Sequence, residues 1–312
     1  MIPFILALPA FIVGILLLYK GSDVLVEGTS KTAAQLGVSA LLISLIIVAF
    51  GTSAPELAIS SGAAIQNHAD ISLGNIIGSC IANLLLVLGI SAIIRPINVQ
   101  RSCIKREMPI VFAATAILLI SSYFGLLDNY HIIGGVIFLI LFVAFVAYFI
   151  RCAQKERNYN KKYNKGTVRK NVLFIIFGII GVIAGAWMLI ESAITIADFL
   201  GIPAFVIAIS MVAVGTSLPE LVVSAMAAFK KESDIAIGNV IGSNVFNILL
   251  ILGVCSLIIP LNAAASLNHQ VILLAVTLIM FPILYTGYII SRKEGAFMLI
   301  LYSIFIWYIF FF

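Results

Sequence analysis

Charged residues are scarce in this chain. Asp, Glu, Lys and Arg make up 10% of its 312 residues, whereas 62% are hydrophobic. A soluble globular domain has about a quarter of its residues charged. The mean hydropathy of +1.20 therefore excludes a soluble fold, and no stretch between the apolar runs is long enough for a soluble domain. We expect an all-α integral membrane protein that resides in a lipid bilayer.

Cysteine and histidine are also few, and neither is arranged as a ligand set. The four cysteines lack the spacing of metal sites or disulfide frameworks. The three histidines fall in or beside separate loops, as interfacial residues do. HExxH, GxSxG and paired catalytic aspartates are absent from the apolar runs. We therefore expect a protein that is not an enzyme and that carries no cofactor. These residues are Cys80, Cys103, Cys152, Cys255, His68, His131 and His269.

Apolar runs recur along the whole sequence, and a run of about 20 residues spans a bilayer. Their number and length predict ten transmembrane helices. The first run could pass for a signal peptide, but it lacks a basic start and a clean cleavage site, so we expect it to be retained. The predicted spans are 3–26, 40–66, 71–94, 108–124, 130–150, 171–197, 204–229, 235–258, 270–290 and 295–312.

The basic residues indicate the orientation of these spans. With ten spans, every loop that contains Lys or Arg falls on one side of the membrane, and the opposite loops contain none. The positive-inside rule makes the basic side cytoplasmic. We therefore expect a multi-pass protein of the cell membrane with both termini outside. The net charge of +5 is then a topology signal, and no nucleic acid or obligate protein partner is indicated.

The chain is duplicated with an offset of 164 residues. This register holds without a gap from Gly14 and Gly178 to Asn98 and Asn262. We expect a first five-helix repeat over 1–150, a basic cytoplasmic linker over 151–170 and a second repeat over 171–312. Because five is odd, the second repeat enters the membrane from the opposite side. Such inverted repeats are typical of secondary transporters that work by alternating access.

The most informative motif is Gly51-Thr52-Ser53-Ala54-Pro55-Glu56, which recurs as Gly215-Thr216-Ser217-Leu218-Pro219-Glu220. Each copy lies inside a long apolar run. Proline removes a backbone donor and frees the carbonyl four residues earlier. A charge at this depth is costly and is usually kept for a function. An ordinary proline kink would explain Pro55 but not the two glutamates. We expect broken helices 2 and 7 to bring Glu56 and Glu220 together at the centre.

A second motif carries a polar stripe on the next helix of each repeat. Asn75, Ser79 and Asn83 are spaced by four residues, and Asn239, Ser243 and Asn247 repeat that stripe. The flanking glycines form a GxxxG face for close helix contact. Packing explains the glycines and also covers Asn75 and Asn239. For the other four residues we favour lining an ion site, together with the glutamates and hydroxyls, because such hard oxygen ligands suit Ca²⁺ and Na⁺.

The two pairs of motifs resemble those of the calcium/cation antiporter superfamily, in particular the Na⁺/Ca²⁺ exchangers of prokaryotes. The resemblance covers nearly the whole chain. It implies that Glu56 and Glu220 bind Ca²⁺ with the backbone carbonyls of Thr52 and Thr216. It also implies Na⁺ sites that involve Ala49, Ser53, Ser79, Ala213, Ser217 and Ser243. Asn83 and Asn247 stand where some members have aspartate, which weakens a K⁺-dependent mechanism.

The predicted function is electrogenic extrusion of Ca²⁺, driven by the Na⁺ gradient. Two ionised glutamates can be neutralised by one Ca²⁺ or by two or more Na⁺, so the two ions compete for one site. An empty pair of buried carboxylates would be very unfavourable in an occluded state. The alternatives are Ca²⁺/H⁺ exchange, K⁺-dependent exchange and, less in keeping with an inverted repeat, a cation channel with a glutamate constriction.

Overall fold

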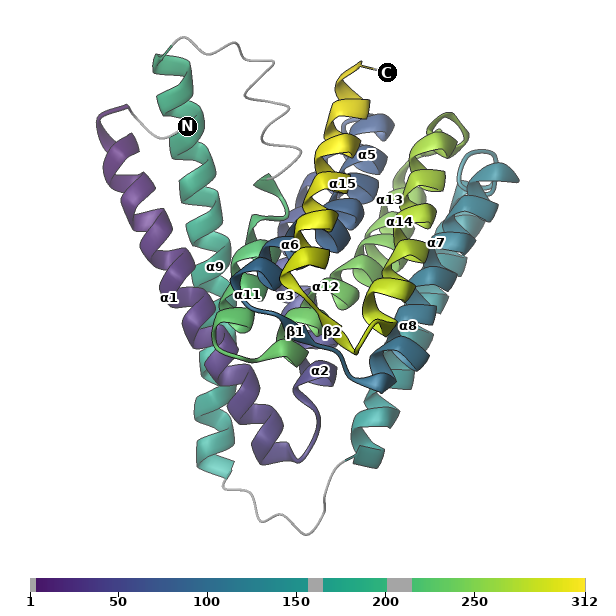
Figure 1. Ribbon diagram of the computed structural model, residues 1–312. Coiled ribbons are helices and arrows are strands. Elements are labelled where there is room, and N and C mark those ends of the chain that lie inside the picture. The colour runs from purple at the N-terminus through teal and green to yellow at the C-terminus, as the bar shows by residue number, and fades with distance from the viewer. Residues whose placement is uncertain (1–3, 157–164, 201–214, 312) are drawn as a thin grey trace.

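The computed structural model describes residues 4–156, 165–200 and 215–311, and within these ranges the protein is almost entirely helical (Figure 1). By length and composition, six of the described helices can cross a bilayer. A seventh candidate is the pair Ala40–Thr52 and Ala54–Ile65, which is bent by 45°. The described chain therefore has the helices of an integral membrane protein, as the composition predicts.

The first half begins with α1 (Phe4–Leu36) and continues through a bent span and a second, continuous one. The bent span consists of α2 (Ala40–Ile43), the π-helical turn η1 (Ser44–Val48), α3 (Ala49–Thr52) and α4 (Ala54–Ile65). The next comprises α5 (Ala69–Ala82), η2 (Asn83–Val87) and α6 (Leu88–Ile94). The half ends with η3 (Cys103–Glu107), α7 (Met108–Tyr123) and α8 (His131–Glu156).

The second half repeats this order with α9 (Lys165–Phe199) and α11 (Leu218–Phe229). A continuous span follows, made of α12 (Ser233–Val245), η5 (Phe246–Ile251) and α13 (Leu252–Ile258). The last elements are η6 (Ala263–Ser266), α14 (Leu267–Tyr285) and α15 (Arg292–Phe311). Each half therefore has a π-helical turn in the middle of its continuous span, at η2 and at η5.

Several helices extend beyond the predicted spans. The span predicted over 3–26 belongs to a helix that reaches Leu36, and α8 and α9 extend into the predicted linker 151–170. Hydropathy marks only the lipid-embedded part of a helix, whereas charged and polar residues such as Lys and Glu propagate the same helix into water. The sequence also gave no sign of the short antiparallel strands β1 (Ile97–Asn98) and β2 (Ile289–Ile290).

Helices α1 and α9 pack tightly side by side and stand apart from most of the bundle (Figure 1). Glycines make this approach close. A Cβ at Gly21 would lie 2.8 Å from the backbone nitrogen of Val182, and one at Gly178 would lie 2.6 Å from the Cβ of Leu25. Small residues allow helix backbones to approach in this way. The two long helices therefore form one tightly packed pair.

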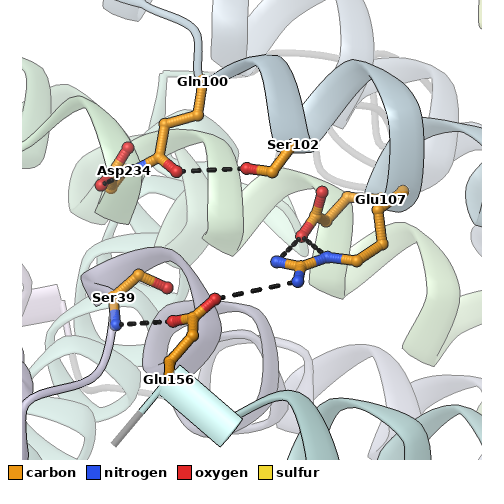
Figure 2. Close-up of polar contacts among 7 residues, drawn as sticks. Ser39, Gln100, Ser102, Glu107, Glu156 and Asp234 are labelled. Atoms are coloured by element: carbon orange, nitrogen blue, oxygen red, sulfur yellow. Dashed lines mark hydrogen bonds and ion pairs between the residues drawn. The ribbon is translucent and has the colours of Figure 1, made fainter. Parts of the chain in front are cut away.

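Polar contacts join several loops and helix ends on the side of the molecule that carries the basic residues. Glu156, at the end of α8, accepts from the Ser39 amide at 3.2 Å and pairs with Arg106 at 3.8 Å. Arg106 also pairs with Glu107 at 2.5 Å (Figure 2). Nearby, Gln100 donates to Asp234 at 2.6 Å. The first set of contacts connects the α1–α2 corner, the end of α8 and η3, and the contact of Gln100 with Asp234 connects the loop after β1 to the start of α12.

Candidate cation-binding centre

Both copies of the proline motif begin a helix in the same way. Ser53 has φ −81° and ψ 5°, and Ser217 has φ −84° and ψ 7°. Each serine precedes a helix whose second residue is proline, Pro55 in α4 and Pro219 in α11. Proline is well tolerated in the first helical turn, where backbone donors have no intrahelical acceptor. The motif therefore starts a new helix at the same place in both halves.

The two glutamates occupy equivalent positions in these new helices. Glu56 lies in the first turn of α4, and Glu220 lies in the first turn of α11. Both side chains are completely buried. The partial positive charge at a helix N-terminus stabilises a carboxylate there. The two groups lie near each other, because Ser53, three residues before Glu56, donates to Glu220 Oε1 at 3.1 Å. The structure thus brings together the two residues that the sequence placed at the centre.

Hydroxyl groups from both halves surround Glu220. Ser53 Oγ, from the break in the first half, donates to Glu220 Oε1 at 3.1 Å. Ser243 Oγ, from α12, donates to the same oxygen at 3.2 Å. The Thr52 hydroxyl lies 3.4 Å from Ser243 Oγ. The predicted residues of the first half are therefore in direct contact with those of the second.

The polar stripe of α5 and η2 meets its counterpart in a similar way. Asn247 Nδ2 donates to Ser79 Oγ at 2.9 Å, and Ser79 Oγ donates to the Asn75 carbonyl at 2.7 Å. Asn83 is completely buried, and neither atom of its amide group has a hydrogen-bond partner among the described residues. Ser79 and Asn247 thus join the stripes of the two halves directly, and Asn83 is buried four residues after Ser79.

Close helix contact sets the relative position of the two halves. A Cβ at Gly242 would lie 2.2 Å from the Leu45 carbonyl oxygen and 2.5 Å from the Ala49 Cβ. Only glycine fits there, and α12 therefore lies directly against η1 and α3. Ser44 Oγ strengthens this contact by donating to the Ile235 carbonyl at 2.7 Å. This packing places Ser243 beside the helix break at Ser53.

Many oxygen atoms in this centre have no hydrogen-bond donor. A buried polar group without a partner is costly, and a buried charge is more so. The ion pairs between described residues join Lys31 to Glu27, Arg106 to Glu107 and Glu156, and Lys230 to Asp23, so none includes Glu56 or Glu220. The acceptors without a partner among described residues are Glu56 Oε1 and Oε2, Glu220 Oε2, Asn83 Oδ1, Asn247 Oδ1 and Ser217 Oγ.

Such a set of oxygens can hold a cation. Carboxylate, amide and hydroxyl oxygens are the ligands of hard cations. Within the described part of the chain, no Lys or Arg compensates the two carboxylates. A mobile cation would supply the missing positive charge. The donor set therefore fits Ca²⁺ or Na⁺ as a transported substrate.

The remaining predicted residues are distributed as follows. Ala49 is buried, and its carbonyl accepts from the Ser53 amide at 3.0 Å and the Thr52 hydroxyl at 3.3 Å. Thr216 and Ser217 are buried at the second break. Ala213 lies outside the described residues. Asn239, which is expected from the sequence to be a packing residue, also belongs to the centre, because its side chain contacts Thr52 at the first break and Glu220 in the first turn of α11.

The acidic residues near the ends of the spans have other partners. Asp23 pairs with Lys230 at 2.5 Å, and Lys20 lies over the Tyr19 ring. Glu27 pairs with Lys31 on the next turn. The side chain of Asp198 lies outside the described residues. Asp23 and Glu27 therefore act as ion-pair partners at the end of α1.

Comparison with known proteins gives one consistent result. The family model described as "Sodium/calcium exchanger protein" matches residues 6–151 and 170–311. The chain is 34% identical to the sodium/calcium exchanger MaX1 of Methanosarcina acetivorans, over 95% of this chain and 96% of that protein. It is 35% identical to the putative antiporter CaxA of Alkalimonas amylolytica, over 92% and 93% of the two chains.

A solved structure shows the same likeness in three dimensions. The sodium-calcium exchanger NCX_Mj, soaked with 10 mM Na⁺ and no Ca²⁺, superimposes with a TM-score of 0.83 and 36% sequence identity. The match covers 97% of this chain and 98% of that one.

Proposed function

Because the chain belongs to the sodium/calcium exchanger protein family, we propose that it extrudes Ca²⁺ from the cell in exchange for Na⁺. Members of this family are transporters, so the protein is a membrane cation antiporter and not an enzyme. The specific proposal is electrogenic exchange by alternating access, with more than two Na⁺ moving per Ca²⁺.

The observation that carries this proposal is the pair of buried glutamates without a cationic partner. Glu56 and Glu220 are fully buried, and together they leave three carboxylate oxygens without a hydrogen-bond donor among described residues. Burying a charge away from water costs free energy, and only a nearby opposite charge offsets that cost. One Ca²⁺ or two or more Na⁺ supply that charge, and the two loads therefore exclude each other. The empty centre resists closure, which enforces exchange.

We assign ligands within the centre as follows. Glu56 and Glu220 hold Ca²⁺ together with the backbone carbonyls of Thr52 and Thr216. Na⁺ uses the hydroxyls and carbonyls around the same carboxylates, and the amides of Asn83 and Asn247 complete the lining. The residues proposed for Na⁺ are Ala49, Ser53, Ser79, Ala213, Ser217 and Ser243. The buried oxygens without donors at Glu56, Asn83, Ser217 and Asn247 support this assignment.

We further propose that α1 and α9 form the moving part. They pack against each other through glycines. The pair also touches the centre, because a Cβ at Gly51 would lie 2.5 Å from the Ile179 Cδ1 atom of α9. A helix pair that covers the break without contributing a ligand can shift while the ion remains bound.

The proposed architecture is ten spans in two inverted repeats, 1–150 and 171–312, joined by the linker 151–170. The family model supports this division, because it matches 6–151 and 170–311 and omits the residues between them. The equal backbone angles at Ser53 and Ser217 also support it. Together with the basic loops, an odd number of spans per repeat implies that both termini lie outside the cell and the basic side is cytoplasmic.

The decisive experiment identifies the counter-ion. Purified protein in proteoliposomes should take up ⁴⁵Ca²⁺ when Na⁺ is loaded inside and the pH is clamped by ionophores. The uptake should respond to membrane potential and proceed without K⁺. Uptake driven only by a pH gradient would establish Ca²⁺/H⁺ exchange, and an absolute need for K⁺ would establish K⁺-dependent exchange. Rapid uptake without any counter-ion would indicate a channel.

A further inference from the structure

One buried side chain connects the two halves of the centre without belonging to the predicted ligands. Asn239, on α12, is completely buried and makes three hydrogen bonds. Its Oδ1 accepts from the Thr52 hydroxyl at 3.0 Å. Its Nδ2 donates to Ser224 Oγ at 3.0 Å and to the Glu220 carbonyl oxygen at 3.3 Å. One amide group therefore joins the first helix break to the helix that carries Glu220.

The equivalent residue of the first half does not make this connection. Asn75 Nδ2 donates to Ser60 Oγ at 2.9 Å, the counterpart of the bond from Asn239 to Ser224. Asn75 Oδ1 has no hydrogen-bond partner among the described residues. Each asparagine thus donates to a serine of its own half. Of the two, only Asn239 also bonds to a described residue of the other half.

We propose that Asn239 is a positioning residue for cation exchange, which holds Thr52 of the first break in register with Glu220 of the second. The inference rests on the proposed function, in which Thr52 and Glu220 both contribute to the cation site. Thr52 is the last residue of α3 and directly precedes the break. A residue beside a helix break has less backbone support than one inside a helix. The hydrogen bond from Thr52 to Asn239 holds Thr52 in place against α12.

The surroundings make α12 suitable for this role. Gly238 and Gly242 lie against Leu41 and Leu45, so these close contacts fix the α12 backbone relative to the first half independently of the Asn239 side chain. Asn239 lies between these two contacts. Buried hydrogen-bonded networks define one arrangement when every member has a partner. Loss of the Asn239 amide leaves the Thr52 hydroxyl without its closest acceptor and allows the turn before Ser53 to reorient.

The expected effect is on ion affinity more than on turnover. Asn239→Ala should raise the Ca²⁺ concentration for half-maximal exchange about tenfold, as expected when a pair of coupled buried partners is separated, with a smaller change in maximal rate. Asn75→Ala should raise it by less than about threefold, because no bond to the other half is lost. Ser224→Ala should resemble Asn75→Ala, since the link to Thr52 remains.

A double-mutant cycle separates positioning from general loss of structure. Thr52→Val removes the same hydrogen bond from the other side and keeps the backbone carbonyl. If Asn239 acts through Thr52, the double variant Asn239→Ala/Thr52→Val should bind Ca²⁺ about as well as either single variant. The control cycle of Asn75→Ala with Thr216→Val should be additive. Should Asn239→Ala aggregate on size-exclusion chromatography, Thr52→Val alone must show the tenfold shift.

Both equilibrium ⁴⁵Ca²⁺ binding to purified protein and Na⁺-driven exchange in proteoliposomes should be measured. Absence of binding and exchange in the unsubstituted protein would refute the proposed function itself. Normal binding with H⁺ as the counter-ion would change that function and leave the cycle interpretable. The positioning role is overturned if the Asn239 and Thr52 effects are additive, or if Asn75→Ala weakens Ca²⁺ binding as much as Asn239→Ala.

Discussion

Equivalent residues in the two halves of the cation centre share a backbone conformation and differ in their hydrogen bonds. Ser53 and Ser217 have nearly equal φ and ψ angles. Yet Glu220 Oε1 accepts from two hydroxyls, whereas neither oxygen of Glu56 has a hydrogen-bond partner among the described residues. Ser53 donates to the glutamate of the opposite half, and Ser217 Oγ has no such partner.

The difference separates what a sequence repeat determines from what packing determines. Equivalent motifs begin their helices with nearly equal backbone angles, because Pro55 and Pro219 act on their own backbone. Side-chain partners depend on how far the facing helix has moved, and a shift of about an ångström makes or breaks a hydrogen bond. The half around Glu220 is therefore organised by protein donors. Glu56 has no such donor among the described residues, and under the proposed function a bound cation compensates its charge.

The largest expected effect comes from removing either carboxylate charge. Glu56→Gln and Glu220→Gln should each abolish Ca²⁺ exchange while the protein is still produced and purified. A charge pair at 4 Å contributes about 4 kcal/mol at an effective dielectric of 20, which corresponds to a loss of affinity on the order of a thousandfold. ⁴⁵Ca²⁺ binding and uptake are the measurements. Equal severity is expected, since both carboxylates hold the same ion under the proposed function.

The control for these variants is the ion pair outside the centre. Lys31→Gln removes the partner of Glu27 on the exposed surface of α1 and should leave Ca²⁺ exchange unchanged. Near-normal exchange in Glu56→Gln or in Glu220→Gln would mean that the affected glutamate is not a ligand. The proposed site would then lose one of its halves.

Several features of this centre were accessible from the sequence, and others were not. The proline motifs and the repeat predicted the helix break before Glu56 and the meeting of Glu56 with Glu220, because both follow from local chemistry and symmetry. The bond between Asn239 and Thr52 joins residues far apart in the chain and depends on the contact of α12 with η1. The pairing of Asp23 with Lys230 joins residues of opposite halves and could not be predicted from the sequence for the same reason.

An intermediate effect is expected from the serines at the two breaks. Ser53→Ala removes a donor to the Glu220 carboxylate, and a hydrogen bond to a charged group contributes about 1.5–3 kcal/mol. Ca²⁺ affinity should therefore fall on the order of tenfold or more. Ser217→Ala removes no hydrogen bond to a glutamate among the described residues and should weaken Ca²⁺ binding less. Equilibrium binding at fixed Na⁺ measures both.

The serine comparison also tests whether the asymmetry persists when ions bind. If Ca²⁺ binding makes the two halves equivalent, Ser53→Ala and Ser217→Ala will weaken it equally. That result would show that the difference between the two serines does not extend to Ca²⁺ binding. A larger effect of Ser217→Ala than of Ser53→Ala would reverse the comparison.

The smallest expected effect concerns the end of α1. Lys230 pairs with Asp23 and also donates to its backbone carbonyl at 3.0 Å. The equivalent positions of the other half are Gln66 and Trp187, which are uncharged. Asp23 and Lys230 are about 32% and 27% exposed, and pairs of this kind contribute about 0.2–1 kcal/mol. Lys230→Ala should therefore lower the thermal unfolding temperature in detergent slightly, and Gln66→Ala should not.

A charge reversal decides whether the pair itself matters. Asp23→Lys alone places two cations together and should destabilise the protein more than Lys230→Ala does. Adding Lys230→Asp should recover part of the loss, because the ionic contact returns while the bond to the carbonyl does not. High salt should reduce every one of these differences, since half-exposed charges are screened. If the double reversal is no more stable than Asp23→Lys, the contact of α1 with the α11–α12 turn depends on packing and not on the ion pair. The charged pair and its uncharged counterpart in the other half would then be held in the same way.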